Sequence, residues 1–168
     1  MPAAAPPFLT RMLGMGLFRA GGPLGSRRRA TIKLAENAVV SGHESAALLM
    51  LAGLDLLDEP PTDSELDEYI ARCFEEMGYP MPTRDECLSH YTCLVAEDIA
   101  SGTISPKDGA NELRDTYLAA RWKGARVDLQ VSRWTDLAEN ANWPYLNPDA
   151  PAEILGEARA LLLRSTIR

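Results

Sequence analysis

The amino-acid sequence predicts an all-α fold, an orthogonal or antiparallel bundle of about six or seven helices built around a helical hairpin at residues 83–122. Three observations support this fold class. Apolar residues recur at steps of three and four in most segments, which is the spacing of one helix face. Residues that cap helices precede these segments, and glycine or proline follows them. Only residues 125–131 alternate in the manner of a strand.

The N-terminal segment 1–30 is rich in alanine, proline and glycine, and it carries arginine but no acid. Residues 8–18 could form a short amphipathic helix, but the sequence GGPLG interrupts it soon afterwards. We expect a disordered basic tail or an overlong gene start here, followed by a single helical domain over residues 31–168. Two alternatives stay open: a targeting peptide, which would also be arginine-bearing and acid-free, and a secretory signal, which Arg11 and Arg19 disfavour.

Two helices are predicted between this tail and the hairpin. Ser41 and Glu44 have the spacing of a capping box ahead of a strongly apolar helix that reaches residue 57. The linker DEPPTD ends that helix, and Thr62 or Ser64 caps the next one. The second helix has one apolar face, and Gly78 ends it; the face consists of Leu66, Tyr69, Ile70, Cys73, Phe74 and Met77.

The hairpin has a clear start, turn and restart. Thr83 and Glu86 form a second capping-box pattern, and Gly102 follows the apolar stripe where a left-handed cap favours glycine. Ser105 then caps the return helix, with Pro106 at its first position. Because the loop is so short, the two helices must be antiparallel neighbours.

Two residues near the turn indicate how closely the hairpin packs. Gly109 lies early in the return helix, where glycine costs about 1 kcal/mol relative to alanine, so we expect the first helix to approach it closely. Ile104 is expected to pack between the two helices.

After the hairpin, residues 125–131 could be extended or helical. A helix is predicted from Ser132 to Asn140 with Trp134 facing inward, followed by a loop that Trp143 and Tyr145 pack down. Pro151 opens the last helix.

The hairpin turn resembles a pattern in small uncharacterised bacterial all-helical proteins, Ile-x-x-Gly-x-Ile-x-Pro-x-x-Gly-Ala preceded by alanine. The matching residues are Ala96, Ile99, Gly102, Ile104, Pro106, Gly109 and Ala110. The resemblance covers residues 44–163 and is a packing signature. It implies a helical fold and carries no established activity.

Charge is unevenly distributed along the chain. Residues 1–35 hold six basic residues and no acid, whereas the rest holds 11 basic and 24 acidic residues, a balance of −13. An acidic body repels phosphate backbones, so we expect no nucleic-acid partner. No apolar run approaches the ~20 residues of a membrane span, so we also expect no membrane association and a cytoplasmic location. The three cysteines are expected to be free thiols in a reducing compartment.

The sequence offers no catalytic, cofactor or metal signature. His43 and Glu44 begin a metalloprotease pattern, but Ala47 stands where the second histidine belongs. Cys87, His90 and Cys93 are spaced by threes, which points the two cysteines about 240° apart on a helix, so one ion cannot readily take all three. We therefore expect no catalytic residues, no metal and no cofactor.

The acidic segment 55–68 is the best functional candidate, with seven acids in fourteen residues. It is either a solvated linker and helix start or a docking surface for a basic protein, with exposed aromatic residues as anchors. The predicted partner-binding set is Asp55, Asp58, Glu59, Asp63, Glu65, Asp67, Glu68, Trp134 and Trp143.

The expected function is a non-catalytic acidic protein-binding module, such as an immunity-type or regulatory partner of a basic protein. The alternative is a small helical enzyme or ligand-binding protein with its site between helix 44–57 and the hairpin 83–122. The oligomeric state does not follow from the sequence.

Overall fold

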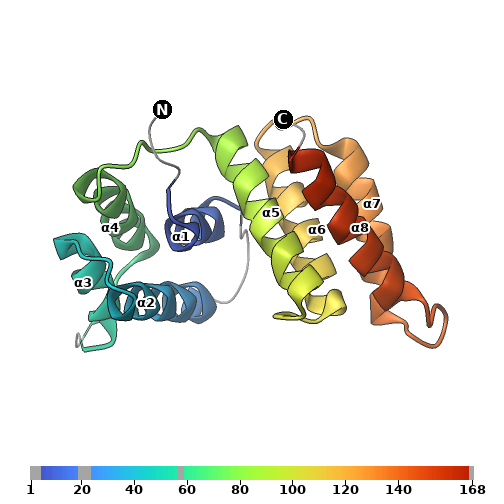
Figure 1. The fold of residues 1–168 in the computed structure, drawn as a ribbon, viewed down its shortest axis with the longest axis horizontal. Helices are drawn as coiled ribbons and strands as arrows, with labels where there is room; N and C mark the ends of the chain where they lie inside the picture. Colours follow the sequence, from blue (N-terminus) through green and yellow to red (C-terminus); the bar gives the residue numbers. More distant parts are fainter. Residues whose placement is uncertain (1–4, 19–23, 57–58, 167–168) are drawn as a thin grey trace. The chain divides into compact units, whose positions relative to one another are not determined.

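A computed structural model describes residues 5–18, 24–56 and 59–166, and these ranges are helical with no β-strand (Figure 1). The predicted all-α class is confirmed. The helices are α1 Pro7–Phe18, α2 Leu24–Val40, α3 Ala46–Ala52, the 3-10 helix η1 Leu54–Leu56, α4 Asp63–Glu76, α5 Arg84–Ser101, α6 Pro106–Trp122, α7 Asp128–Asn142 and α8 Ala150–Thr166. No described helix combines the length and apolar character that a membrane span requires.

The chain divides into two compact units, Met1–Cys87 (unit 1) and Leu88–Arg168 (unit 2). The boundary falls in the first turns of α5. This organisation differs from the single domain expected over residues 31–168. Amphipathic spacing shows that each helix has a buried face but does not show which helices share a core.

Unit 1 is built from α1 to α4. Helix α3 packs against α2 and α4, and α1 packs against the same two helices. Their shared core includes Leu9 and Met12 of α1, Ile32 of α2, Leu48 of α3 and Phe74 of α4, all buried. The first 30 residues were expected to form a tail, but the described part of them forms α1 and begins α2, because the apolar residues of α1 complete this core.

Of the two helix caps predicted in unit 1, the structure confirms the one that begins α4 and contradicts the one at Ser41. Thr62, one of the two predicted candidates, caps α4, and it also forms a capping box with Glu65. Gly78 follows the end of α4, as predicted, with a φ of 74°. The box expected at Ser41 is wrong. Helix α2 continues to Val40 and the Ser41 hydroxyl donates to the Asn37 carbonyl at 2.8 Å, so Ser45 caps α3 instead.

Unit 2 consists of most of α5 together with α6, α7 and α8. Helix α6 packs against α7, and α8 packs against both. Helix α7 begins at Asp128, four residues before the predicted Ser132, and so residues 128–131 are helical. Val131, Trp134 and Leu137 share its buried face, whereas Leu129 is exposed.

The hairpin α5–α6 has the predicted local geometry. The Thr83 amide donates to Glu86 Oε2 at 2.7 Å, and the Glu86 amide donates back to Thr83 Oγ1 at 3.3 Å. Gly102 has a φ of 75°, and Ser105 accepts from the Asp108 amide at 3.1 Å. These contacts confirm the predicted start, turn and restart.

Gly109 of α6 lies close to Ile99 of α5. A β-carbon there would overlap Ile99 of α5 and would lie 3.1 Å from Ile104 Cδ1. Gly156 of α8 is a matched contrast, because a β-carbon on it would meet nothing within 4 Å. The predicted close approach at Gly109 is therefore confirmed.

Replacing Gly109 by alanine should destabilise the protein by about 1–3 kcal/mol, since overpacking outweighs the gain of about 1 kcal/mol in helix propensity. Gly156→Ala should instead stabilise it by about 0.5–1 kcal/mol. Urea unfolding followed by circular dichroism checks both. Equal effects of the two substitutions would show that Gly109 is not sterically required.

Candidate functional site

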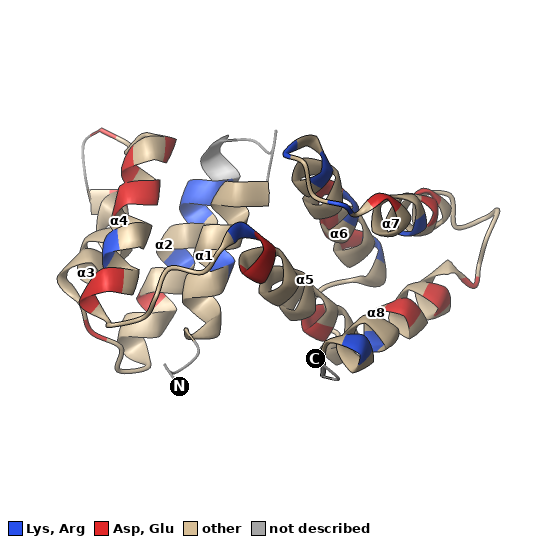
Figure 2. Cartoon of the chain, turned by 90° about the horizontal axis from the view of Figure 1, so that it is seen from above, with Lys and Arg blue, Asp and Glu red and all other residues tan. Residues whose placement is uncertain are grey.

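The predicted acidic cluster lies on η1, the segment after it and the first turns of α4, all within unit 1. Figure 2 shows acidic residues along α4 and basic residues on α2. Asp58 lies outside the described residues. The other six acids have three different environments, which decide what each can do.

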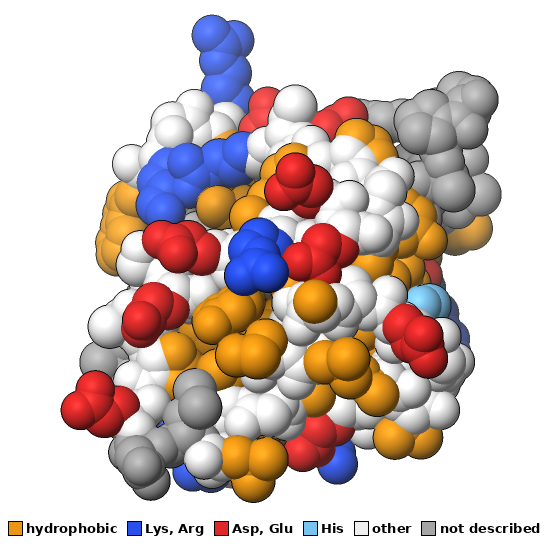
Figure 3. Space-filling model, turned by 90° about the vertical axis from the view of Figure 1, so that its left-hand side faces the viewer, with side chains coloured by type: hydrophobic (Ala, Val, Ile, Leu, Met, Phe, Trp, Pro, Cys, Tyr) orange, Lys and Arg blue, Asp and Glu red, His pale blue; other side chains and the backbone are white. Residues whose placement is uncertain are grey.

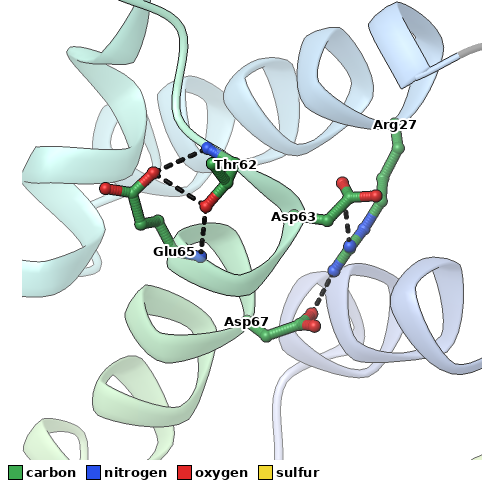
Figure 4. Close-up of polar contacts among 5 residues, drawn as sticks. All are labelled: Arg27, Thr62, Asp63, Glu65 and Asp67. Carbon is green, nitrogen blue, oxygen red and sulfur yellow. Dashed lines mark hydrogen bonds and ion pairs between the residues drawn. The ribbon is translucent and has the colours of Figure 1, made fainter.

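Asp63 and Asp67 both pair with Arg27 of α2 (Figure 4). The Arg27 Nη1 atom lies 3.2 Å from Asp63 Oδ1, and its Nη2 atom pairs with Asp67 Oδ1. The two acids are one helical turn apart and so face the same side of α4. Arg27 is only 9% exposed, and a charge that is so buried is costly unless it is paired. This bridge therefore joins α2 to α4.

A glycine of α1 leaves room for the bridge. A β-carbon on Gly16 would lie 2.9 Å from Asp67 Oδ1 and 3.0 Å from Arg27 Cζ. Both atoms belong to side chains, so a substitution would have to displace the bridge. Three helices of unit 1 therefore meet at Arg27.

Asp55 is paired in a similar way. Its Oδ1 atom lies 3.1 Å from Arg28 Nη2, so consecutive arginines of α2 reach η1 and α4. The side chain of Asp55 is largely exposed, and such a pair contributes only about 0–1 kcal/mol. Three acids of the predicted docking cluster are thus neutralised within the chain.

Glu65 caps its own helix. The Thr62 amide and hydroxyl both donate to Glu65 Oε2, at 2.7 and 2.8 Å, and the Glu65 amide donates to Thr62 Oγ1 at 3.2 Å (Figure 4). The backbone hydrogen bond from Thr62 lowers the pKa of Glu65. Glu76, at the end of α4, accepts from the Ala47 amide at 2.8 Å, and this bond lowers the pKa of Glu76.

These two glutamates predict a loss of stability in acid. A carboxyl group whose pKa is lower in the folded state stabilises the fold above its unfolded pKa, and this contribution disappears as pH falls through the folded value. The ordinary pKa of both groups is 4.5, so the melting temperature should fall as pH drops below about 4.5.

Thermal unfolding between about pH 6 and pH 3 checks this. The double variant Glu65→Gln, Glu76→Gln should show a weaker pH dependence than the wild type. Glu59→Gln, Glu68→Gln is the matched control and should keep the wild-type profile. Identical profiles for all three proteins would contradict the assignment.

Two acids of the cluster, Glu59 and Glu68, are available for contact with another molecule. Both side chains are exposed, and neither forms an ion pair or hydrogen bond with the part of the chain that the structure describes. They are the members of the predicted set that can meet a partner without first breaking an internal contact.

The two predicted tryptophan anchors belong to unit 2 and differ from each other. Trp134 is 1% exposed in the core, so its assignment as a partner-binding residue is wrong; its place on the apolar face of α7 buries it. Trp143 is exposed and contacts Tyr145 edge to face, with ring centroids 5.8 Å apart. It remains available to a partner, although it was expected to pack its loop down.

The cysteines and histidines form no cluster. Cys73 and Cys87 are buried, which raises the pKa of each thiol to about 11, and Cys93 is half-buried. His90 is exposed, and His43 lies against the Phe8 ring. Within the described ranges, no group of three or more histidine, cysteine or acidic side chains is arranged to hold a metal ion.

Unit 1 also exposes large apolar side chains. Leu49 and Met50 of α3 and Leu56 of η1 are exposed although they are large. Figure 3, which looks onto the α3–α4 side of unit 1, shows hydrophobic side chains gathered on this face, with acidic and some basic side chains among and around them. We use the name outer face of unit 1 for five exposed residues that lie on α3, on η1, in the segment after it and on α4: Leu49, Met50, Leu56, Glu59 and Glu68.

The sequence analysis missed Arg27 and Arg28 of α2 because it placed both of them in the N-terminal tail 1–30. A signal was nevertheless present: the acid-free segment 1–35 and the acidic segment 55–68 have opposite charge and lie in one chain. Comparisons of the chain with protein-family models, with curated proteins and with solved structures find no match.

Proposed function

We propose that the protein is a non-catalytic, cytoplasmic protein-binding module that docks a basic protein through the outer face of unit 1. One observation carries the proposal: unit 1 exposes large apolar side chains and also exposes acids that form no ion pair with any described residue. Contiguous apolar surface bordered by polar residues is typical of interaction sites. Acidic residues around it would speed the encounter with a basic partner and disfavour acidic ones.

The ion pairs divide the acidic cluster into two parts with separate roles. Asp63 and Asp67 hold Arg27, so a partner that took them would leave a buried guanidinium uncompensated. Glu59 and Glu68 form no ion pair with any described residue, so a partner can contact them without exposing a buried charge. In the proposed complex, Leu49 and Met50 supply apolar contact, and the flexible methionine adapts to the partner's surface.

A pull-down from the native host tests this, with the bound proteins identified at low and at high salt. The wild type should retain one basic protein in near-stoichiometric amount and lose it at high salt. Glu59→Lys, Glu68→Lys should fail to retain it, and so should Leu49→Asp. Glu97→Lys, an exposed substitution in unit 2, is the control and should bind like the wild type.

Recovery of no protein by the wild type would reject the proposal. Equal recovery by the Glu59→Lys, Glu68→Lys variant would reject this face as the binding surface. Circular dichroism of each variant shows that a loss of binding is not a loss of folding, since all the substituted side chains are exposed.

A further inference from the structure

The turn between α7 and α8 in unit 2 presents three large side chains to solvent. Trp143 is 54% exposed, Tyr145 is 72% exposed and Leu146 is 74% exposed, all within four consecutive residues. Trp143 and Tyr145 lie edge to face at an interplanar angle of 85°. Tryptophan and tyrosine are among the residues most enriched in the positions that dominate binding energy at interfaces.

Hydrogen bonds within the turn define its shape. The amides of Leu146 and Asn147 both donate to the Trp143 carbonyl, at 2.9 and 3.3 Å. The Asp149 amide donates to Asn147 Oδ1 at 3.1 Å, and Pro144 restricts the backbone between the two rings. A turn fixed before binding loses less conformational entropy when a partner arrives.

Along the sequence, the charged residues on either side of this turn are all of one sign. Between Trp134 and Gly156 the chain carries Asp136, Glu139, Asp149 and Glu153 and no lysine or arginine. All four acids are exposed, and no described residue forms an ion pair with them. An anionic partner would be repelled here, and a cationic one attracted.

A second exposed tryptophan in unit 2 has basic residues beside it in the sequence instead of acidic ones. Trp122 is 72% exposed at the end of α6, and Arg121 and Lys123 flank it in the sequence. Unit 2 therefore contains two exposed tryptophans that differ in the sign of the neighbouring charge. Only the one in the acidic setting suits a cation.

We propose that the α7–α8 turn binds an arginine-bearing segment of another protein. A guanidinium group can stack on an aromatic ring and at the same time pair with a carboxylate, whereas a lysine ammonium stacks less well and is more strongly hydrated. Trp143 and Tyr145 supply the rings, and Glu139 and Asp149 are the nearest acids along the chain. This site does not rest on the function proposed for unit 1.

Isothermal titration of the protein with hexa-arginine and with hexa-lysine peptides at low salt tests the proposal. Hexa-arginine should bind more tightly than hexa-lysine, although the two carry the same charge. Trp143→Ala, Tyr145→Ala should weaken hexa-arginine binding about tenfold, because two exposed cation–π contacts are lost. Trp122→Ala is the matched control and should leave the affinity unchanged.

The acids of unit 1 could also attract these peptides, so the titration is repeated in the Glu59→Lys, Glu68→Lys background. The difference between the two peptides should persist there. Equal affinity for hexa-arginine and hexa-lysine, or wild-type affinity in Trp143→Ala, Tyr145→Ala, would overturn the proposal. Because both rings are exposed, their removal should leave the circular dichroism spectrum unchanged, and this verifies the fold.

Discussion

Trp134→Ala should lower the free energy of unfolding by about 3–5 kcal/mol, the usual cost of deleting a buried aromatic side chain. Among the described residues, Trp134 is the largest of the fully buried side chains, and it lies on the inner face of α7. Its removal leaves a cavity that surrounding helices can close only in part. Few single substitutions in the described chain should have a larger effect.

Trp143→Ala provides the control for this experiment, since it removes the same side chain from an exposed position on the following turn. Its effect on stability should stay within about 0.5 kcal/mol. Urea unfolding followed by circular dichroism measures both variants. Losses of similar size would mean that Trp134 does not lie in a packed core.

Deletion of residues 1–18 should unfold unit 1. The deletion removes Leu9, Met12 and Phe18, which are all buried, and each contributes about 1.5–3 kcal/mol by burial. Their sum is comparable with the whole stability of a typical domain, which is about 5–15 kcal/mol. If the segment were a disordered tail, the same deletion would change nothing.

The thiol of Cys73 reports the outcome. It is fully buried in unit 1, and its pKa is raised to about 11, so it should react slowly with an alkylating reagent in the intact protein. The deletion should make it react as fast as a free thiol. Leu9→Ala should increase the rate to a smaller extent, and unchanged protection after deletion would contradict the assignment of α1 to the core.

Local sequence patterns correctly predicted the helix ends whose geometry depends on one residue and its near neighbours in the sequence. The cap at Thr62, the capping box at Thr83 and the left-handed glycine at Gly102 all follow from contacts within a few residues. Ser41 shows how this reasoning fails. Two serines precede the same apolar run, and the choice between them depends on how far α2 extends, which is decided by its packing against α3.

The candidate site was less predictable because its main contacts are distant in the sequence. Arg27 and Asp67 are forty residues apart, and nothing local to either residue indicates the other. Spacing on α7 correctly predicted that Trp134 faces inward, which is incompatible with its use as an anchor. The exposure of Trp143 depends on how its turn folds, and periodicity does not describe turns.

Both units are continuous in sequence, and this has a consequence for biosynthesis. The first 87 residues contain both partners of the Arg27 bridge and the entire shared core of α1 to α4. Domains generally fold in the order in which the ribosome releases them. Unit 1 can therefore form the Arg27 ion pairs and bury its core while the helices of unit 2 are still being translated. Its folding does not require contacts with residues that are synthesised later.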